Sequence, residues 1–325
     1  MNIGLQITKN KIKYDKLLKL FPLEILKSIN FIHIKDDNSL KNYISDLDAL
    51  VCYEINRNIF INRGKKLKWI HIGAAGIEDS LHNEVIKSNV IITNAKGIHV
   101  NPVSEYVICC MLYFAKNFNE FYNFKINRFW NQWELAKNIS QLSGKTVGIL
   151  GFGCIGKAIA KKAKAFDMNV IATRRLQKKV ESKKIVDRLV PISDIDVIFK
   201  ESDYVVVACP LTPLTHNLVD QLKFKLMKKD SVFINISRGK IVNEIHLISF
   251  LKKKLIKGAA LDVFTDEPLN SKSELYDLDN VIISPHVSGN FPEYQSEMIK
   301  QYSIILQRFL DKKTLINRVC KKRLY

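Results

Sequence analysis

The sequence lacks several features that would place the protein in a membrane or outside the cell. It has no run close to the roughly 18 consecutive apolar residues of a membrane-spanning helix, so we expect no membrane partner. Met1–Ile7 has neither a basic segment nor a cleavage site, and predicts a short strand instead of a signal peptide. The 6 cysteines show no metal-ligand or redox-pair spacing. We therefore expect no bound metal and a cytoplasmic protein with reduced thiols.

Arginine is also scarce, although the net charge is +19. A basic protein can bind nucleic acid, but arginine is the preferred residue for reading bases, and no groove-reading motif accompanies the charge. The positive charge is mostly scattered lysine, with small clusters at Lys65–Lys66, Lys252–Lys254 and Lys321–Arg323 that are typical of solvated surfaces. We expect no nucleic-acid partner. Attraction for anionic ligands stays open.

Two series of short β-branched runs alternate with helical patterns, which predicts parallel sheets with helices on both faces. Apolar residues at helical spacing over Tyr14–Ile29 illustrate the intervening helices. The first series of expected strands is 2–6, 31–34, 49–53, 69–72 and 90–93, and the second is 146–150, 169–172, 203–208, 231–234, 259–262 and 281–283.

An apolar helix over 102–118 and an aromatic-rich stretch ending at Trp133 separate the two series, and the tail over 292–310 is again helical. A compact arrangement is a discontinuous first domain, residues 1–102 and 290–325, with a second domain, residues 103–289, inserted into it. This organisation predicts a ligand-binding cleft between the domains.

The segment 146–160 carries the strongest local signal, a strand that runs into a G-x-G-x-x-G turn and then a helix. Gly151 permits the tight turn, Gly153 lets the backbone approach a pyrophosphate, and Gly156 lets helix and strand pack closely. Cys154 and Ile155 lie between them, at a helix N-terminus whose N–H groups attract phosphate. The sequence therefore predicts a dinucleotide site.

The second strand of this domain ends in Thr173, Arg174 and Arg175, where an NAD-preferring site usually has an acidic residue. A guanidinium cannot accept hydrogen bonds from the ribose 2′-hydroxyl, but it can bind a 2′-phosphate in bidentate fashion. We expect NADP(H), with NAD(H) as the alternative.

Three later strands deliver polar residues at their C-terminal ends, where open α/β sheets bind ligands. Arg238 follows one strand, Asp262 ends the next, and His286 follows the third. Taken singly, each residue is more often structural than catalytic.

Together these segments resemble the D-isomer-specific 2-hydroxyacid dehydrogenases, over nearly the whole chain. The motifs that carry the resemblance are the glycine turn, 209–215 (CPLTPLT), 235–239 (NISRG) with 242–244 (VNE), 260–264 (ALDVF) with 267–269 (EPL), 284–286 (SPH), and in the first domain 73–78 (GAAGIE) and 93–95 (TNA). The resemblance implies two doubly wound parallel-sheet α/β domains, with a Rossmann cofactor domain inserted into a flavodoxin-like substrate domain.

The resemblance also implies roles for single residues. Arg238 would hold the substrate carboxylate and carbonyl, and His286 would donate a proton to the carbonyl oxygen. Glu267 would fix the imidazole tautomer and favour its protonated form. Asp262 would hold the nicotinamide carboxamide. The backbone at Ala75 and Gly76 would receive the carboxylate, and further cofactor contacts are expected at Cys209, Pro210, Thr215, Ile236, Ser237, Ser288 and Gly289.

Two positions depart from the family pattern. Glu78 stands where Asp is frequent, and we expect it to support its loop. Asp167 replaces a common Gly after the helix of the glycine turn, a place where Asp still tolerates left-handed backbone.

The leading prediction is therefore an NADPH-dependent reductase that converts glyoxylate, hydroxypyruvate or a similar 2-oxo acid into a D-2-hydroxy acid. Formate dehydrogenases of this family generally pair the histidine with Gln, so Glu267 argues against formate. A short phosphoglycerate dehydrogenase stays open, as does a dinucleotide-sensing protein like the corepressors that share the fold. The family also predicts a homodimer, formed through the apolar helix near Val103–Phe114. The sequence leaves open which acid is used.

Overall fold

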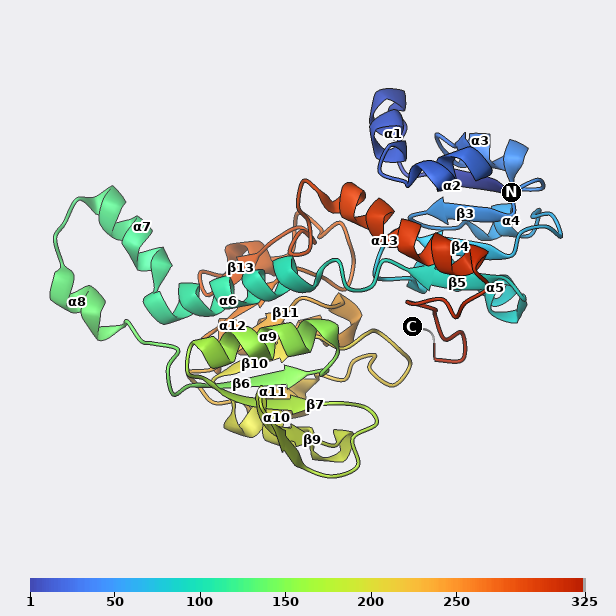
Figure 1. Cartoon of the computed structure of the whole chain (residues 1–325). Helices are drawn as coiled ribbons and strands as arrows, with labels where there is room; N and C mark the ends of the chain where they lie inside the picture. The colour runs from blue at the N-terminus through green and yellow to red at the C-terminus, as the bar shows by residue number, and fades with distance from the viewer. Residues whose placement is uncertain (324–325) are drawn as a thin grey trace. The chain divides into compact units, whose positions relative to one another are not determined.

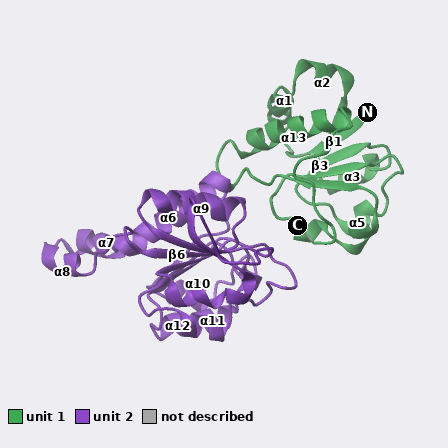
Figure 2. Cartoon of the chain, turned by 60° about the horizontal axis from the view of Figure 1, so that its bottom comes forward, with its two compact units in different colours: residues 1–99, 291–325 green, residues 100–290 purple. Residues whose placement is uncertain are grey.

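The computed structural model describes residues 1–323, and the chain divides into two compact units (Figures 1 and 2). Unit 1 consists of Met1–His99 and the chain from Phe291 onward, and unit 2 is Val100–Asn290. The units divide at 99/100, near the predicted boundary at 102/103, because α6 (Val100–Lys116) begins at Val100 and belongs wholly to unit 2. The second boundary moves by one residue, from 289/290 to 290/291.

Unit 1 contains a five-stranded parallel sheet in the order β2-β1-β3-β4-β5. The strands are β1 (Asn2–Gln6), β2 (Asn30–His33), β3 (Ala49–Cys52), β4 (Trp69–Ile72) and β5 (Ile91–Asn94). Their runs of Ile, Leu and Val are buried because helices cover both faces. This is the flavodoxin-like order, and it confirms the predicted fold class.

Two layers of helices enclose that sheet. Residues of α1 (Lys11–Leu18), α2 (Leu23–Ser28) and α13 (Tyr294–Leu310) form one core with it, and residues of α3 (Asp37–Tyr43), α4 (Arg57–Phe60) and α5 (Asn83–Lys87) form the other. The helical pattern predicted over 14–29 is interrupted between α1 and α2. Pro22 is the N-cap of α2, where its missing N–H costs no hydrogen bond.

Unit 2 contains an eight-stranded sheet in the order β13-β12-β11-β10-β6-β7-β9-β8, parallel except for the β8–β9 pair. Its strands are β6 (Thr146–Leu150), β7 (Asn169–Thr173), β8 (Glu181–Lys183), β9 (Val186–Val190), β10 (Tyr204–Val207), β11 (Val232–Asn235), β12 (Gly258–Leu261) and β13 (Val281–Ile283). The order reverses between β6 and β10, so the sheet is doubly wound.

Figure 2 shows α6 and α9 (Cys154–Ala165) on one face of this sheet and α10 (Asp196–Glu201), α11 (Gln221–Leu226) and α12 (Glu244–Lys252) on the other. Two further helices, α7 (Phe118–Asn127) and α8 (Gln132–Lys137), extend away from the sheet in both views. Short 3-10 turns lie at Glu78–Ser80, Ile192–Asp194, Gly239–Ile241 and Glu274–Asp277. None of the helices within residues 1–323 has the length and apolarity to cross a membrane.

Candidate active site

The glycine turn joins β6 to α9 and has the geometry of a phosphate-binding turn. Gly151 has φ +110°, and a Cβ added there would lie 2.7 Å from the Cys209 nitrogen. A Cβ on Gly156 would lie 2.1 Å from the Gly151 carbonyl oxygen. Gly153, the N-cap of α9, has no other atom within 4 Å of a Cβ built on it. The turn therefore leaves space at the helix N-terminus, which fits the pyrophosphate of a dinucleotide.

The end of β7 is tied to this turn. The Thr173 carbonyl accepts hydrogen bonds from the Gly151 amide at 3.2 Å and the Phe152 amide at 2.8 Å. Arg174 and Arg175 follow directly and are exposed. Cys154 is exposed at the start of α9, whereas Ile155 packs against the core. The structure thus brings the predicted ribose-end residues next to the predicted phosphate turn.

The loop after β10 is held in shape by Thr215. Its hydroxyl donates to the Pro210 carbonyl at 2.7 Å and accepts from the Thr212 amide at 2.8 Å. The Ser237 hydroxyl donates to the Cys209 carbonyl, and so joins this loop to the one after β11. Burial raises the pKa of the Cys209 thiol to about 12, so it stays protonated at neutral pH.

His286 lies after β13 and contacts an acidic partner. Its Nδ1 is 2.7 Å from Oε2 of Glu267, whose other oxygen accepts the Phe264 amide at 3.0 Å. The two side chains are 49% and 35% exposed, so the pair can meet a ligand. His286 also has φ +53°, a left-handed conformation that non-glycine residues adopt mainly where the surroundings enforce it.

Asp262 at the end of β12 enforces that conformation. Its side chain is 1% exposed, and its two oxygens accept hydrogen bonds from the Ser284 hydroxyl (2.6 Å), the Val287 amide (2.8 Å) and the Ser288 amide (3.0 Å). Its backbone carbonyl accepts the His286 amide at 2.9 Å. Asp262 therefore shapes segment 284–288, and its expected contact with a nicotinamide carboxamide stays a prediction.

Tyr106 on α6 extends this network and was not found from the sequence. Its hydroxyl is 2.7 Å from the Ser284 hydroxyl, and burial raises its pKa, so the phenol stays protonated. The two residues are 178 positions apart, and no local motif marks the tyrosine as a partner.

Arg238 follows β11 and is half-buried. One guanidinium nitrogen donates to the Ser237 carbonyl at 2.7 Å, and the Asn235 side chain donates through Nδ2 to the Arg238 carbonyl at 3.1 Å. A Cβ on Gly239 would lie 1.8 Å from the Phe264 carbonyl carbon. The arginine loop therefore packs directly against the loop that leads to Glu267.

The predicted carboxylate loop belongs to unit 1 and follows β4. The Asn94 side chain donates to the Ala75 carbonyl at 2.8 Å, and the Ala95 amide donates to the Ala74 carbonyl at 3.1 Å. Glu78 accepts the Ile77 amide at 2.9 Å, so it does support its own loop. The roles of Ala75 and Gly76 in substrate binding stay predictions.

The doubly wound sheet, the glycine turn and the His–Glu pair define a nicotinamide-dependent oxidoreductase. The sequence model of the D-isomer specific 2-hydroxyacid dehydrogenase NAD binding domain matches residues 108–288. The chain belongs to this D-isomer specific 2-hydroxyacid dehydrogenase family.

Relatives agree with this membership. The chain is 33% identical over 289 residues to a glyoxylate reductase of Pyrococcus horikoshii, which covers 85% of this chain and 84% of the relative. It is 34% identical over 271 residues to a putative 2-hydroxyacid dehydrogenase of Staphylococcus saprophyticus, covering 82% and 84%. An NADPH-dependent glyoxylate/hydroxypyruvate reductase of Sinorhizobium meliloti, solved with NADP and sulfate, shares the fold with TM-score 0.86 at 22% identity, covering 100% and 99%.

Proposed function

We propose that the protein reduces a small 2-oxo acid, such as glyoxylate or hydroxypyruvate, to the D-2-hydroxy acid. The observation that carries the proposal is the exposed His286–Glu267 pair at 2.7 Å, beside the arginine loop after β11. Relatives named glyoxylate reductase support the substrate class.

The residues of the chain suit the proton transfer and the orientation of the substrate. With Glu267 on Nδ1, His286 presents Nε2 as the atom that donates a proton to the substrate carbonyl oxygen, and it accepts the proton in the reverse direction. Arg238 binds the carboxylate through its guanidinium fork and orients the carbonyl. A bound nicotinamide would supply the hydride. The turn at Gly151, Gly153 and Gly156 would hold its pyrophosphate.

We further propose that NADPH is the preferred cofactor. The support is that Arg174 and Arg175 are exposed immediately after β7, and no acidic residue takes the usual place there. Glu181 is a carboxylate whose pKa is affected by the charge of Arg174. Hydrogen bonds from Lys183 and Gln177 lower this pKa most, and the charge of Arg174 contributes least.

Arg174→Asp tests this preference. The substitution removes the guanidinium and adds a repelling charge, so we expect the KM for NADPH to rise at least about tenfold while the KM for NADH changes little. Lys178→Asp makes the same charge change at an exposed position nearby and serves as the control. An equal rise in KM for both cofactors would contradict the proposed preference for NADPH.

A substrate panel tests the reaction itself. Glyoxylate, hydroxypyruvate and 3-phosphohydroxypyruvate are each offered with NADPH and with NADH, and the chirality of the product from hydroxypyruvate is determined. We expect turnover with NADPH and the D-product. Preference for the phosphorylated acid would instead indicate a short phosphoglycerate dehydrogenase. Cofactor binding without turnover on any acid would indicate a dinucleotide-sensing protein.

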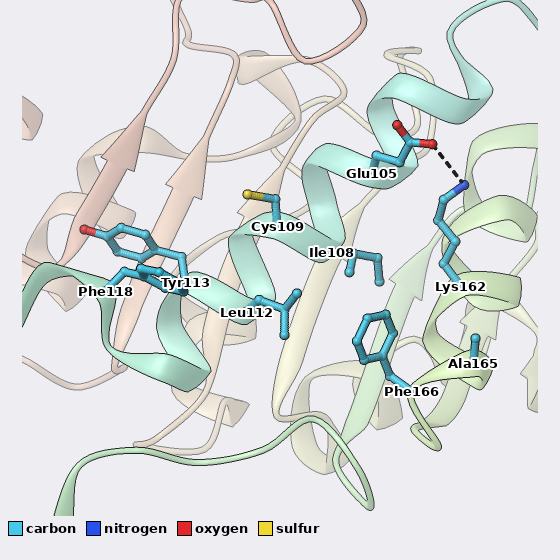
Figure 3. Close-up of a pocket in the computed structure, with 9 residues that line it drawn as sticks. All are labelled: Glu105, Ile108, Cys109, Leu112, Tyr113, Phe118, Lys162, Ala165 and Phe166. Carbon is cyan, nitrogen blue, oxygen red and sulfur yellow. Dashed lines mark ion pairs between the residues drawn. The ribbon is translucent and has the colours of Figure 1, made fainter. Parts of the chain in front are cut away.

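We also propose that the chain forms a homodimer through the α6–α8 region. Side chains of α6 and α9 line an apolar groove of about 580 Å³, and Glu105 and Lys162 form an ion pair at 3.8 Å there. Figure 3 shows side chains of α6 facing Phe166, which follows α9. Helices α7 and α8 bury no residue, and Phe129, Trp130 and Trp133 are 68–77% exposed. Short helices need tertiary packing to be stable. We propose that a second copy of the chain packs on the arm formed by α7 and α8 and on the groove, because a two-fold dimer covers both surfaces in each subunit.

A cytoplasmic location completes the proposal. Its support is that all 6 cysteines are free, which suits a reducing compartment.

A further inference from the structure

The C-terminal tail forms a cavity beside β5 that the proposed reaction does not use. Arg318 pairs with Thr93 in an antiparallel bridge, and the Val319 amide donates to the Ile92 carbonyl at 2.9 Å. The tail thus runs along the outer edge of β5 in unit 1. Between them lies a cavity of about 480 Å³, which is the size of a small-molecule site.

The charge of this cavity is one-sided. Its charged lining residues are Arg318, Lys321 and Lys322, and among residues 1–323 no acidic residue lines it. The Lys321 ammonium is fixed in place, because it donates to the Ser88 carbonyl at 2.9 Å and lies 3.2 Å from the Ser88 hydroxyl. Burial, followed by the charges of Arg318 and Arg63, lowers the pKa of Lys321. The charges of Arg318 and Arg63 therefore act on one half-buried ammonium group.

Two other half-buried lysines of this chain have acidic partners: Lys164 pairs with Asp187 at 2.6 Å, and Lys223 pairs with Asp196. Lys116, also half-buried, donates to the Ser140 carbonyl at 3.0 Å instead. Within residues 1–323, Lys321 has no carboxylate within ion-pair distance. Clustered like charges repel, and partial burial strengthens the repulsion. A bound anion would remove this cost.

The rest of the cavity wall is apolar. Val90, Ile91, Ile92 and Val319 line it, and three of these four side chains are at most 6% exposed. A ligand that matches both halves has an anionic group and an apolar body. Phosphate suits the cationic half, because guanidinium and ammonium groups together can bind several phosphate oxygens.

We propose that this tail cavity binds a small organic phosphate, with its phosphate at Arg318, Lys321 and Lys322 and its apolar body against Val90 and Val319. The cavity is formed by residues of unit 1, whereas the glycine turn is formed by residues of unit 2. It also gives a role to part of the net charge of +19.

Binding of phenyl phosphate to the full chain, saturated with NADPH, tests the proposal. Titration calorimetry measures the affinity, and hydrogen exchange maps where protection appears. We expect protection of 88–92 and 318–323. Arg318→Gln/Lys321→Gln should weaken binding at least about tenfold. Lys13→Gln/Lys312→Gln, an equal loss of charge at exposed sites of unit 1, should change it less than twofold.

Lys322→Gln tests the site even if the double variant fails to fold. Lys322 is exposed, so its substitution should weaken binding without lowering stability. Inorganic phosphate should bind more weakly than phenyl phosphate if the apolar wall contributes. The proposal is overturned if phenyl phosphate does not bind, if both double variants weaken binding equally, or if protection appears only at 151–157.

Discussion

At the scale of single residues, the reactive histidine is fixed from two sides. Glu267 holds the ring through Nδ1, and the buried Asp262 holds the backbone of the same segment through the amides of His286, Val287 and Ser288. The left-handed backbone of His286 is unfavourable for a non-glycine residue and persists because these contacts hold it. They thereby fix the position of Nε2 for proton transfer.

Glu267→Gln should therefore lower kcat by roughly 10- to 100-fold with little change in cofactor KM. The amide can still accept the Phe264 hydrogen bond, but it removes the charge that stabilises the imidazolium. Steady-state kinetics with hydroxypyruvate measures the effect, and Asp266→Asn, the exposed neighbour, is the control. An unchanged kcat in the Gln variant would show that the pair has no catalytic part.

Most of these residues were predictable because each occupies the end of a strongly apolar strand within a recognisable motif. Tyr106 was not, because its contact with Ser284 spans 178 positions and depends on how α6 packs. The same limit applies to His286: its position was predicted, but its left-handed backbone depends on the Asp262 contacts.

At the scale of elements, β-branched runs predicted the central strands to within a residue or two, but missed β8 and β9. Glu181–Lys183 is polar and exposed because β8 is the edge strand of the sheet. Val186–Val190, the strand next to it, mixes charged and apolar residues and so gives no continuous apolar run. Likewise, the break between α1 and α2 follows from Pro22, which overrides the helical spacing around it.

Strands β4 and β5 are joined by a buried network that makes unit 1 sensitive to acid. His71 is fully buried with Nδ1 2.9 Å from the Thr93 hydroxyl, which also accepts the Trp69 indole N–H at 2.8 Å. Burial lowers the pKa of His71 from 6.5 to about 3. The folded state therefore excludes a proton that the unfolded chain binds between these values.

The direction in which pH changes the free energy of unfolding follows from the difference between these two pKa values. The stabilisation is complete above pH 6.5 and is lost as the pH falls from 6.5 toward 3, so at pH 5 this group should cost about 2 kcal/mol relative to pH 7.5. Urea unfolding at both pH values measures it. His71→Gln should be less stable overall but should lose less stability on acidification. An identical pH dependence in both proteins would contradict the assignment.

At the scale of the whole molecule, each unit has its own two-sided core, and the tail helix α13 returns to complete the first unit. The α7–α8 arm is the part of unit 2 that these cores leave without packing. The fold class and the inserted arrangement followed from the two series of strands, whereas the arm offered no periodic signal beyond its aromatic residues.

Trp130→Ser/Trp133→Ser should convert a dimer to a monomer, since it removes the two most exposed aromatic side chains of the arm. Light scattering after size exclusion measures the mass. Trp69 is buried in unit 1, so its fluorescence reports the fold of that unit, and circular dichroism of the whole chain reports whether unit 2 still folds. A wild-type chain that is monomeric at micromolar concentration would contradict the proposed dimer.

The central claim is that His286 supplies the proton in 2-oxo acid reduction, and His286→Gln tests it most directly. Cofactor consumption with hydroxypyruvate and cofactor binding are measured on the same preparations. The account predicts that turnover falls by about 10²- to 10⁴-fold while the affinity for NADPH stays within a few-fold of wild type. Turnover equal to wild type in the Gln variant would contradict it.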